Sequence, residues 1–82
     1  MKMYSRVLTR LRLIIAEVAD VRSHVVTINT YFQDDLKLSK NDLKELGKRI
    51  EDEFDIKLPK KVFKEFNTVG EIVGLIEAER GR

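Results

Sequence analysis

An 82-residue chain with 43% hydrophobic and 37% charged residues is long enough for one small domain and too evenly mixed for a disordered or membrane-embedded protein. No apolar run approaches the roughly 18 residues of a membrane-spanning helix. Cysteine is absent, which excludes disulfides and thiolate metal sites, and the net charge of +2 selects no class of partner. We expect a single domain over residues 1–82, with no secretory signal and a cytoplasmic location.

The first predicted element is a helix over about residues 5–18. Its apolar residues recur at the spacings that place them on one face of a helix, whereas Leu13 falls off that face. The apolar stripe consists of Val7, Leu8, Leu11, Ile14, Ile15 and Val18.

Residues 20–38 have no helical period, so we expect a long connection. A loop of this length is uncommon unless its own apolar side chains attach it to the core. Seven such residues are available for this purpose: Val25, Val26, Ile28, Tyr31, Phe32, Leu36 and Leu38.

A second helix is predicted over residues 39–54. Ser39 is a suitable N-cap, and Asp42 stands where the acid of a capping box belongs. Gly47 lies within the apolar stripe, where it costs about 1 kcal/mol of helix propensity relative to alanine. Either a close approach by another helix or simple tolerance explains it. The stripe itself is Leu43, Leu46, Ile50 and Phe54.

Pro59 ends this helix, and residues 60–66 are expected to form one short helical turn. The last helix, over residues 69–79, begins at a capping box made by Thr68 and Glu71. The predicted fold class is therefore all-α: an antiparallel bundle of three main helices plus one short helix, with a long first loop. We expect a monomer.

No catalytic or metal-binding set is evident. His24 is the single histidine and lies in a polar stretch, so a general base would lack a partner. Asp34 and Asp35 alone are weak as metal ligands. Basic residues alternate with acidic ones, which is typical of solvated helix faces and disfavours nucleic-acid binding. These observations predict that the protein is not an enzyme.

Three segments carry a resemblance to a known family. Residues 14–20 read IIAEVAD, residues 32–59 read FQDDLKLSKNDLKELGKRIEDEFDIKLP, and residues 68–76 read TVGEIVGLI. In register and at correct spacing, these segments resemble the acyl carrier proteins over about residues 5–78. The resemblance implies the family's antiparallel helical bundle and a role near fatty-acid or polyketide biosynthesis.

The chain departs from that family at one decisive position. The family's aspartate, serine and leucine fall on Ser39, Lys40 and Asn41. By this resemblance, the serine that carries 4′-phosphopantetheine is replaced by Lys40, whose amine cannot form the phosphodiester. Ser39 lies one residue earlier, where we expect its oxygen to cap the helix.

The positions that follow Lys40 also depart from the family pattern, since they carry polar residues in place of apolar ones. Family members offer apolar residues to partner enzymes where this chain has Asn41, Lys44 and Lys48, and Lys40, Lys44 and Lys48 form one basic ridge. Since family partners usually present basic patches to an acidic carrier, the ridge is expected to repel them. Phe63 is expected to fill the family's acyl pocket, leaving it small or closed. The residues expected to line this pocket are Leu46, Ile50, Leu58, Phe63 and Phe66.

The leading hypothesis is an acyl-carrier-like protein without a cofactor that acts as an interaction or regulatory module, with lipid or polyketide synthesis enzymes among its protein partners. An alternative is a specialised carrier that takes 4′-phosphopantetheine on Ser39. A third possibility is a small basic helical domain that binds nucleic acid or an anionic surface, with strongly salt-dependent binding.

Overall fold

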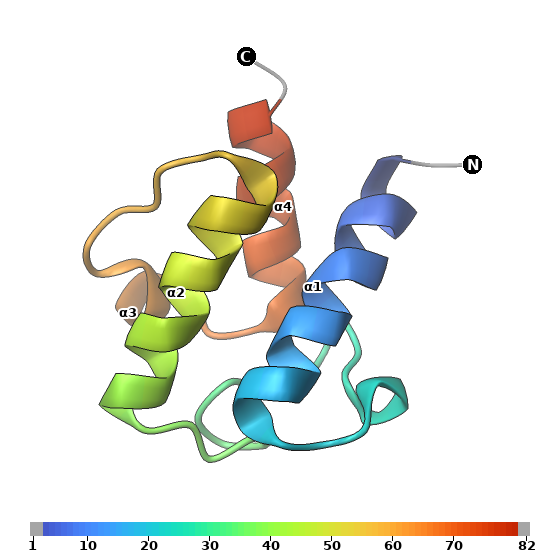
Figure 1. Ribbon diagram of the computed structural model, residues 1–82, viewed down its shortest axis with the longest axis vertical. Helices are drawn as coiled ribbons and strands as arrows, with labels where there is room; N and C mark the ends of the chain where they lie inside the picture. The colour runs from blue at the N-terminus through green and yellow to red at the C-terminus, as the bar shows by residue number, and fades with distance from the viewer. Residues whose placement is uncertain (1–2, 81–82) are drawn as a thin grey trace.

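The computed structural model describes residues 3–80, which form a bundle of α-helices (Figure 1). α1 runs antiparallel to α2 and α4 and contacts both of them. Between residues 3 and 80, the one extended pairing is an isolated antiparallel bridge between Tyr31 and Thr68. The all-α prediction is therefore confirmed. In chain order, the elements are α1 (Met3–Ala19), the 3-10 turn η1 (Ser23–Val25), α2 (Lys40–Phe54), α3 (Val62–Glu65) and α4 (Val69–Arg80).

The core is built from the predicted helical stripes. Leu11 and Ile15 of α1 are fully buried, and so are Leu46 and Ile50 of α2. Leu13 is 54% exposed, as its position off the stripe predicts. α4 contributes a buried face of four residues: Val69, Ile72, Val73 and Ile76.

Two ion pairs cross the outer side of the α1–α2 contact. Arg10 pairs with Glu53, and Arg49 pairs with Glu17. The hydrogen bond to Glu17 raises the pKa of the Arg49 guanidinium above its ordinary value. Because these groups lie at the surface, the two pairs add little to the stability of the fold. They satisfy the charges on this side of α2 within the molecule.

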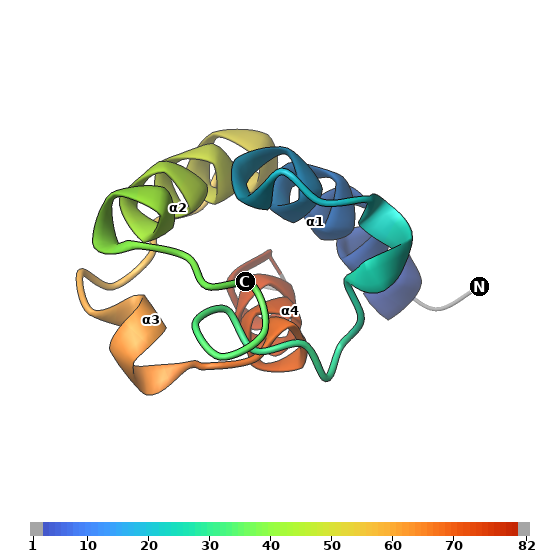
Figure 2. The ribbon, with the colours of Figure 1, turned by 90° about the horizontal axis from the view of Figure 1, so that it is seen from below.

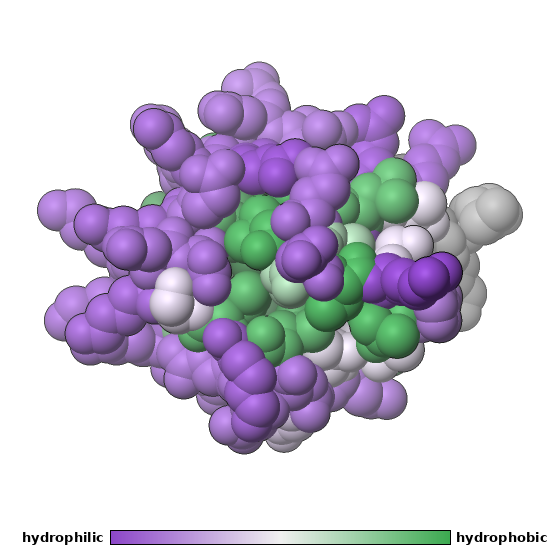
Figure 3. Space-filling model, turned by 60° about the horizontal axis from the view of Figure 1, so that its bottom comes forward, coloured by the Kyte–Doolittle hydropathy of each residue, from purple (hydrophilic) through white to green (hydrophobic). Residues whose placement is uncertain are grey.

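The long loop crosses the end of the bundle at which α4 begins (Figure 2). Val26, Phe32 and Leu38 are buried and attach it to the core, as predicted. The expectation was wrong for Val25 and Ile28, which are 49% and 38% exposed. Apolar surface is accordingly visible on this end of the molecule (Figure 3).

Hydrogen bonds hold the parts of the long loop whose apolar side chains are exposed. Tyr31 is the third loop residue that we expected to attach the loop to the core, and it is 45% exposed, whereas its neighbour Thr30 is buried. The Thr30 hydroxyl accepts a hydrogen bond from the Thr27 backbone N–H at 2.9 Å. Arg12 of α1 donates from two nitrogens to the Ser23 carbonyl at 3.1 and 3.2 Å. Because these turns are irregular, successive side chains point in directions that no period in the sequence predicts.

Backbone hydrogen bonds join the same loop to the start of α4. The N–H of Val69 donates to the Thr30 carbonyl at 3.0 Å, and that of Gly70 donates to the Ile28 carbonyl at 2.8 Å. A Cβ at Gly70 would lie 2.9 Å from the Ile28 oxygen, closer than a side chain permits. Glycine is therefore required here by a close approach between two backbones.

Gly47 is different. A Cβ added there would meet only the Phe63 ring edge, at the ordinary contact distance of 3.5 Å. No neighbouring backbone comes close to this position, so of the two explanations offered for Gly47, simple tolerance agrees with the structure.

Candidate functional site

The start of α2 is fixed by a complete capping box. The Ser39 hydroxyl accepts from the Asp42 N–H at 3.1 Å, and the Asp42 carboxylate accepts from the Ser39 N–H at 2.9 Å. Ser39 has an extended backbone and is the N-cap, which confirms the prediction for this residue. Its oxygen is therefore engaged in holding the helix end.

Lys40 is the first residue of α2, and its side chain is exposed. A cation at this end of a helix is unfavourable because it faces the positive end of the macrodipole. Asp42 is the acidic residue in the first turn that offsets it. Lys44 and Lys48 are exposed and follow one and two turns later, and Asn41 is exposed beside them.

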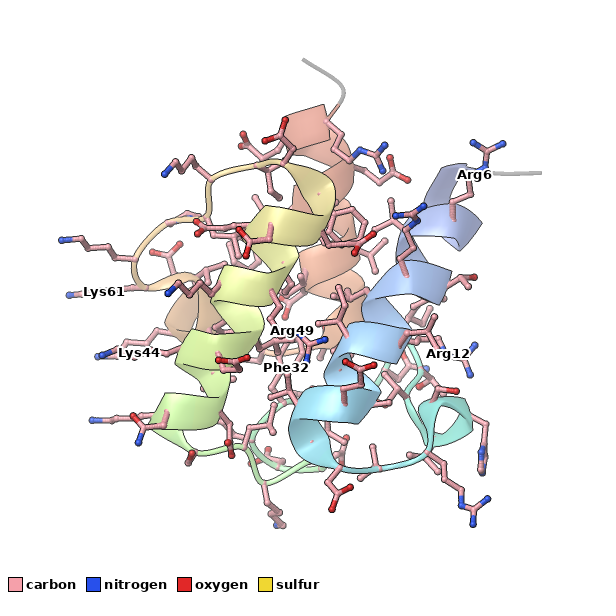
Figure 4. The ribbon with its side chains drawn as sticks, in the orientation of Figure 1. Arg6, Arg12, Phe32, Lys44, Arg49 and Lys61 are labelled. Carbon is pink, nitrogen blue, oxygen red and sulfur yellow. The ribbon has the colours of Figure 1, made fainter. Side chains whose placement is uncertain are left out.

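A groove of about 520 Å³ lies between α2 and the segment that leads into α3. Its walls and floor are largely apolar, and lysines from both sides stand around it. Lys44 and Lys61, from the two sides, extend in the same direction (Figure 4). The apolar part consists of Leu43, Gly47, Leu58, Pro59, Val62 and Phe63. The lysines are Lys40, Lys44, Lys48, Lys60, Lys61 and Lys64.

The residues predicted to line an acyl pocket separate into two groups. Leu58 and Phe63 line the groove, whereas Leu46 and Ile50 are fully buried in the core beneath it. Phe66 is partly buried and packs against the core. The space beside Phe63 is an open surface groove, and it is not the pocket between the last three helices that we expected to be small or closed; that expectation stays a prediction. Binding of an acyl chain to these residues stays a prediction.

Phe63 links the groove to the core. Its ring packs edge-on against the buried ring of Phe32, with centroids 5.2 Å apart and an angle of 78° between the planes. Phe32 is 1% exposed and Phe63 is half-buried. The groove wall is thus held by a rigid aromatic contact rather than by a flexible side chain.

Glu51 holds the two sides of the groove together. Its carboxylate accepts from the Leu58 backbone N–H at 2.7 Å, which holds the segment after α2 against the helix. Glu51 is the one carboxylate among the residues that line the groove. One of its carboxylate oxygens is thus engaged with the chain's own backbone.

Sequence reasoning missed the second side of the groove. Lys60, Lys61 and Lys64 are evident as a cluster in the sequence, but only the path of the chain after Pro59 brings them opposite α2. Together with Val62 and Phe63, these lysines predicted a short helical turn. The sequence did not indicate which element that turn faces.

The remaining candidate groups do not gather into a site. His24 is exposed in η1. Among residues 3–80, no group of three or more histidine, aspartate or glutamate residues could hold a metal ion. In the same range, no helix is both long enough and apolar enough to cross a bilayer.

Comparison with known proteins agrees with this architecture. Residues 9–76 match the family described as a phosphopantetheine attachment site, which defines the class of domain. The acyl carrier protein of Borrelia garinii subsp. bavariensis is 35% identical over 75 residues, covering 92% of this chain and 94% of that protein. The acyl carrier protein of Phenylobacterium zucineum is 38% identical over 77 residues, covering 94% and 98%.

This chain belongs to the acyl carrier protein family. Proteins of this family are carriers and not enzymes, so the prediction of a non-enzymatic protein is confirmed.

Proposed function

We propose that this acyl carrier protein homologue does not take 4′-phosphopantetheine. It acts instead as a monomeric interaction or regulatory module beside cytoplasmic enzymes of fatty-acid or polyketide-type synthesis. The observation that carries the proposal is Lys40 at the first position of α2. The resemblance aligns this residue with the family's attachment serine. Its amine does not fit the group, because the arm is joined through a phosphate ester to a hydroxyl.

The geometry of Ser39 supports the same conclusion. Its hydroxyl oxygen accepts from the Asp42 N–H, so attachment there would disturb a cap worth about 1 kcal/mol to the helix. The residue also has extended rather than helical backbone geometry. An arm on Ser39 would therefore leave the domain one residue earlier and in a different direction.

The surface that follows Lys40 supports a change of partner. Lys44 and Lys48 are exposed in line with it on α2. Enzymes that present basic patches to an acidic carrier would meet like charge at this surface, and like-charge contacts disfavour a complex.

The proposal is tested by incubating the protein with coenzyme A and a broad-specificity phosphopantetheinyl transferase. The intact mass should stay unchanged. Lys40→Ser should be modified poorly because the basic ridge remains, and further replacement of Lys44 and Lys48 by acidic or apolar residues should increase modification. The acyl carrier protein of Phenylobacterium zucineum, incubated in parallel, is the positive control for the transferase.

A mass gain of one arm on the unaltered chain would contradict the proposal. If Ser39→Ala then removed that gain, the alternative of a specialised carrier modified on Ser39 would replace it.

A further inference from the structure

The groove beside α2 combines two properties that seldom occur together on a surface. Its floor is apolar and includes Gly47, whose missing Cβ would lie 3.5 Å from the ring edge of Phe63. Phe63 forms one wall and is fixed by its contact with Phe32. Contiguous apolar surface in a concave site favours burial of apolar groups of a partner.

Cations stand along both sides of this floor. Lys40, Lys44 and Lys48 recur at every helical turn and together span about 12 Å along α2. Lys60, Lys61 and Lys64 stand on the opposite side. The groove is therefore positive along its length and not at one end.

These lysines are not neutralised by the protein itself. Within residues 3–80, the ion pairs are those of Arg10 and Arg49 on the α1 side of α2, and none involves a groove lysine. Glu51 is the one carboxylate in the groove lining, so positive charge remains in large excess there. Six cations thus face solvent around an apolar floor.

The distribution of charge selects one kind of occupant. A single-chain amphiphile carries its charge at one end, so it would leave most of the lysines without a partner. Duplex nucleic acid presents phosphates but no apolar ridge to cover the floor. An amphipathic helix with an apolar ridge and acidic residues on both flanks matches both features.

We propose that this groove docks an acidic amphipathic helix of a partner protein, with the apolar ridge seated over Gly47 and the acidic flanks against the two rows of lysines. The inference rests on the proposed function, since it names the kind of partner through which the module acts. Weak binding is expected, because one short helix in a groove lies at the low end of interface sizes.

The test uses a fluorescent helical peptide of about three turns, with leucines on one face and glutamates along both flanks. Fluorescence anisotropy should report saturable binding to the full chain. The same peptide with glutamine in place of each glutamate should bind at least about tenfold more weakly, and added salt should weaken the glutamate peptide.

Lys44→Glu combined with Lys61→Glu changes one lysine on each side and should weaken binding by at least about tenfold, since each reversal removes an attraction and adds a repulsion. Lys48→Glu with Lys64→Glu is a second pair, in case the first does not fold by circular dichroism. Lys37→Glu with Lys57→Glu is the matched control: both lysines are exposed and outside the groove lining, and binding should change less than about twofold.

Three results would overturn the inference: no binding of the glutamate peptide, equal binding of the glutamine peptide, or equal weakening by the control pair. Binding of oleate or duplex DNA that the groove variants abolish, without peptide binding, would assign the groove to that ligand instead. The protein's mass is measured before each titration. Failed binding by a chain of unmodified mass therefore rejects this inference alone, whereas attachment of the arm rejects the proposed function.

Discussion

The two sides of α2 use the same kinds of charged residue in opposite ways. Toward α1, Arg49 pairs with Glu17, and Glu53 pairs with Arg10, so the charges are satisfied within the molecule. Toward α3, the helix presents Lys40, Lys44 and Lys48 beside an apolar floor. A net charge of +2 conceals this division. The position of each charge around one helix axis therefore tells more about the surface than the balance of charges does.

The largest difference between the core and the groove should appear when one apolar side chain is truncated in each. Ile50→Ala removes a fully buried side chain and should lower the free energy of unfolding by about 2–5 kcal/mol. Phe63→Ala, at a half-buried groove wall, should cost less, about 1–3 kcal/mol, and should weaken peptide binding as well. Urea denaturation measures both losses. Equal losses would show that Phe63 is a core residue and not part of a surface groove.

Two glycines give a smaller and sharper contrast. Gly70→Ala should destabilise the fold by about 1–3 kcal/mol, because its Cβ would lie 2.9 Å from the Ile28 carbonyl oxygen. Gly47→Ala should instead stabilise it by up to about 1 kcal/mol through helix propensity, because its Cβ would make only an ordinary contact.

The same Gly47→Ala variant should weaken peptide binding by reducing the depth of the groove. Thermal unfolding and fluorescence anisotropy on one preparation check both effects. A destabilised Gly47→Ala variant would contradict the tolerance ascribed to this position, and undiminished binding would contradict a ridge seated over Gly47.

The smallest expected effect lies at the start of α4, away from both sides of α2. Backbone hydrogen bonds from Asn67 and then Thr68 lower the pKa of Glu71 below its ordinary value. Its ionised form therefore favours the folded state. This contribution is complete above the ordinary pKa of glutamate, and it is lost as the pH falls through the lowered pKa.

Denaturation series from about pH 7 to about pH 3 should accordingly show a shallower acid decline for Glu71→Gln than for the unaltered chain. Glutamine keeps an acceptor oxygen, so the helix cap is retained in this variant. An unchanged decline would assign the acid sensitivity to other carboxylates.

Local signals predicted the parts of the fold that are determined locally. Ser39 and Asp42 form the capping box that their spacing indicates, and Leu13 is exposed because it lies off the stripe. The start of α4 follows from Thr68 and Glu71 in the same way, with hydrogen bonds in both directions between them. Each of these features depends on residues within a few positions of one another.

The rest required the tertiary structure. No period in the loop indicated that Val26 is buried while its neighbour Val25 is exposed. Likewise, the lysine ridge on α2 could be read from its spacing, but its opposition to Lys60, Lys61 and Lys64 depends on the path of the chain after Pro59. The requirement for glycine at position 70 comes from the backbone of Ile28, which is distant in the sequence.

The contact between Ile28 and Gly70 also bears on the order in which the molecule assembles. It joins two positions that are distant in the sequence, so its formation must await closure of the whole intervening chain. Besides its buried residues Val26, Phe32 and Leu38, the loop is held by backbone hydrogen bonds to the start of α4. We therefore expect the loop to stay unsettled until α4 has docked, so that the first connection of the chain is among the last parts to become ordered.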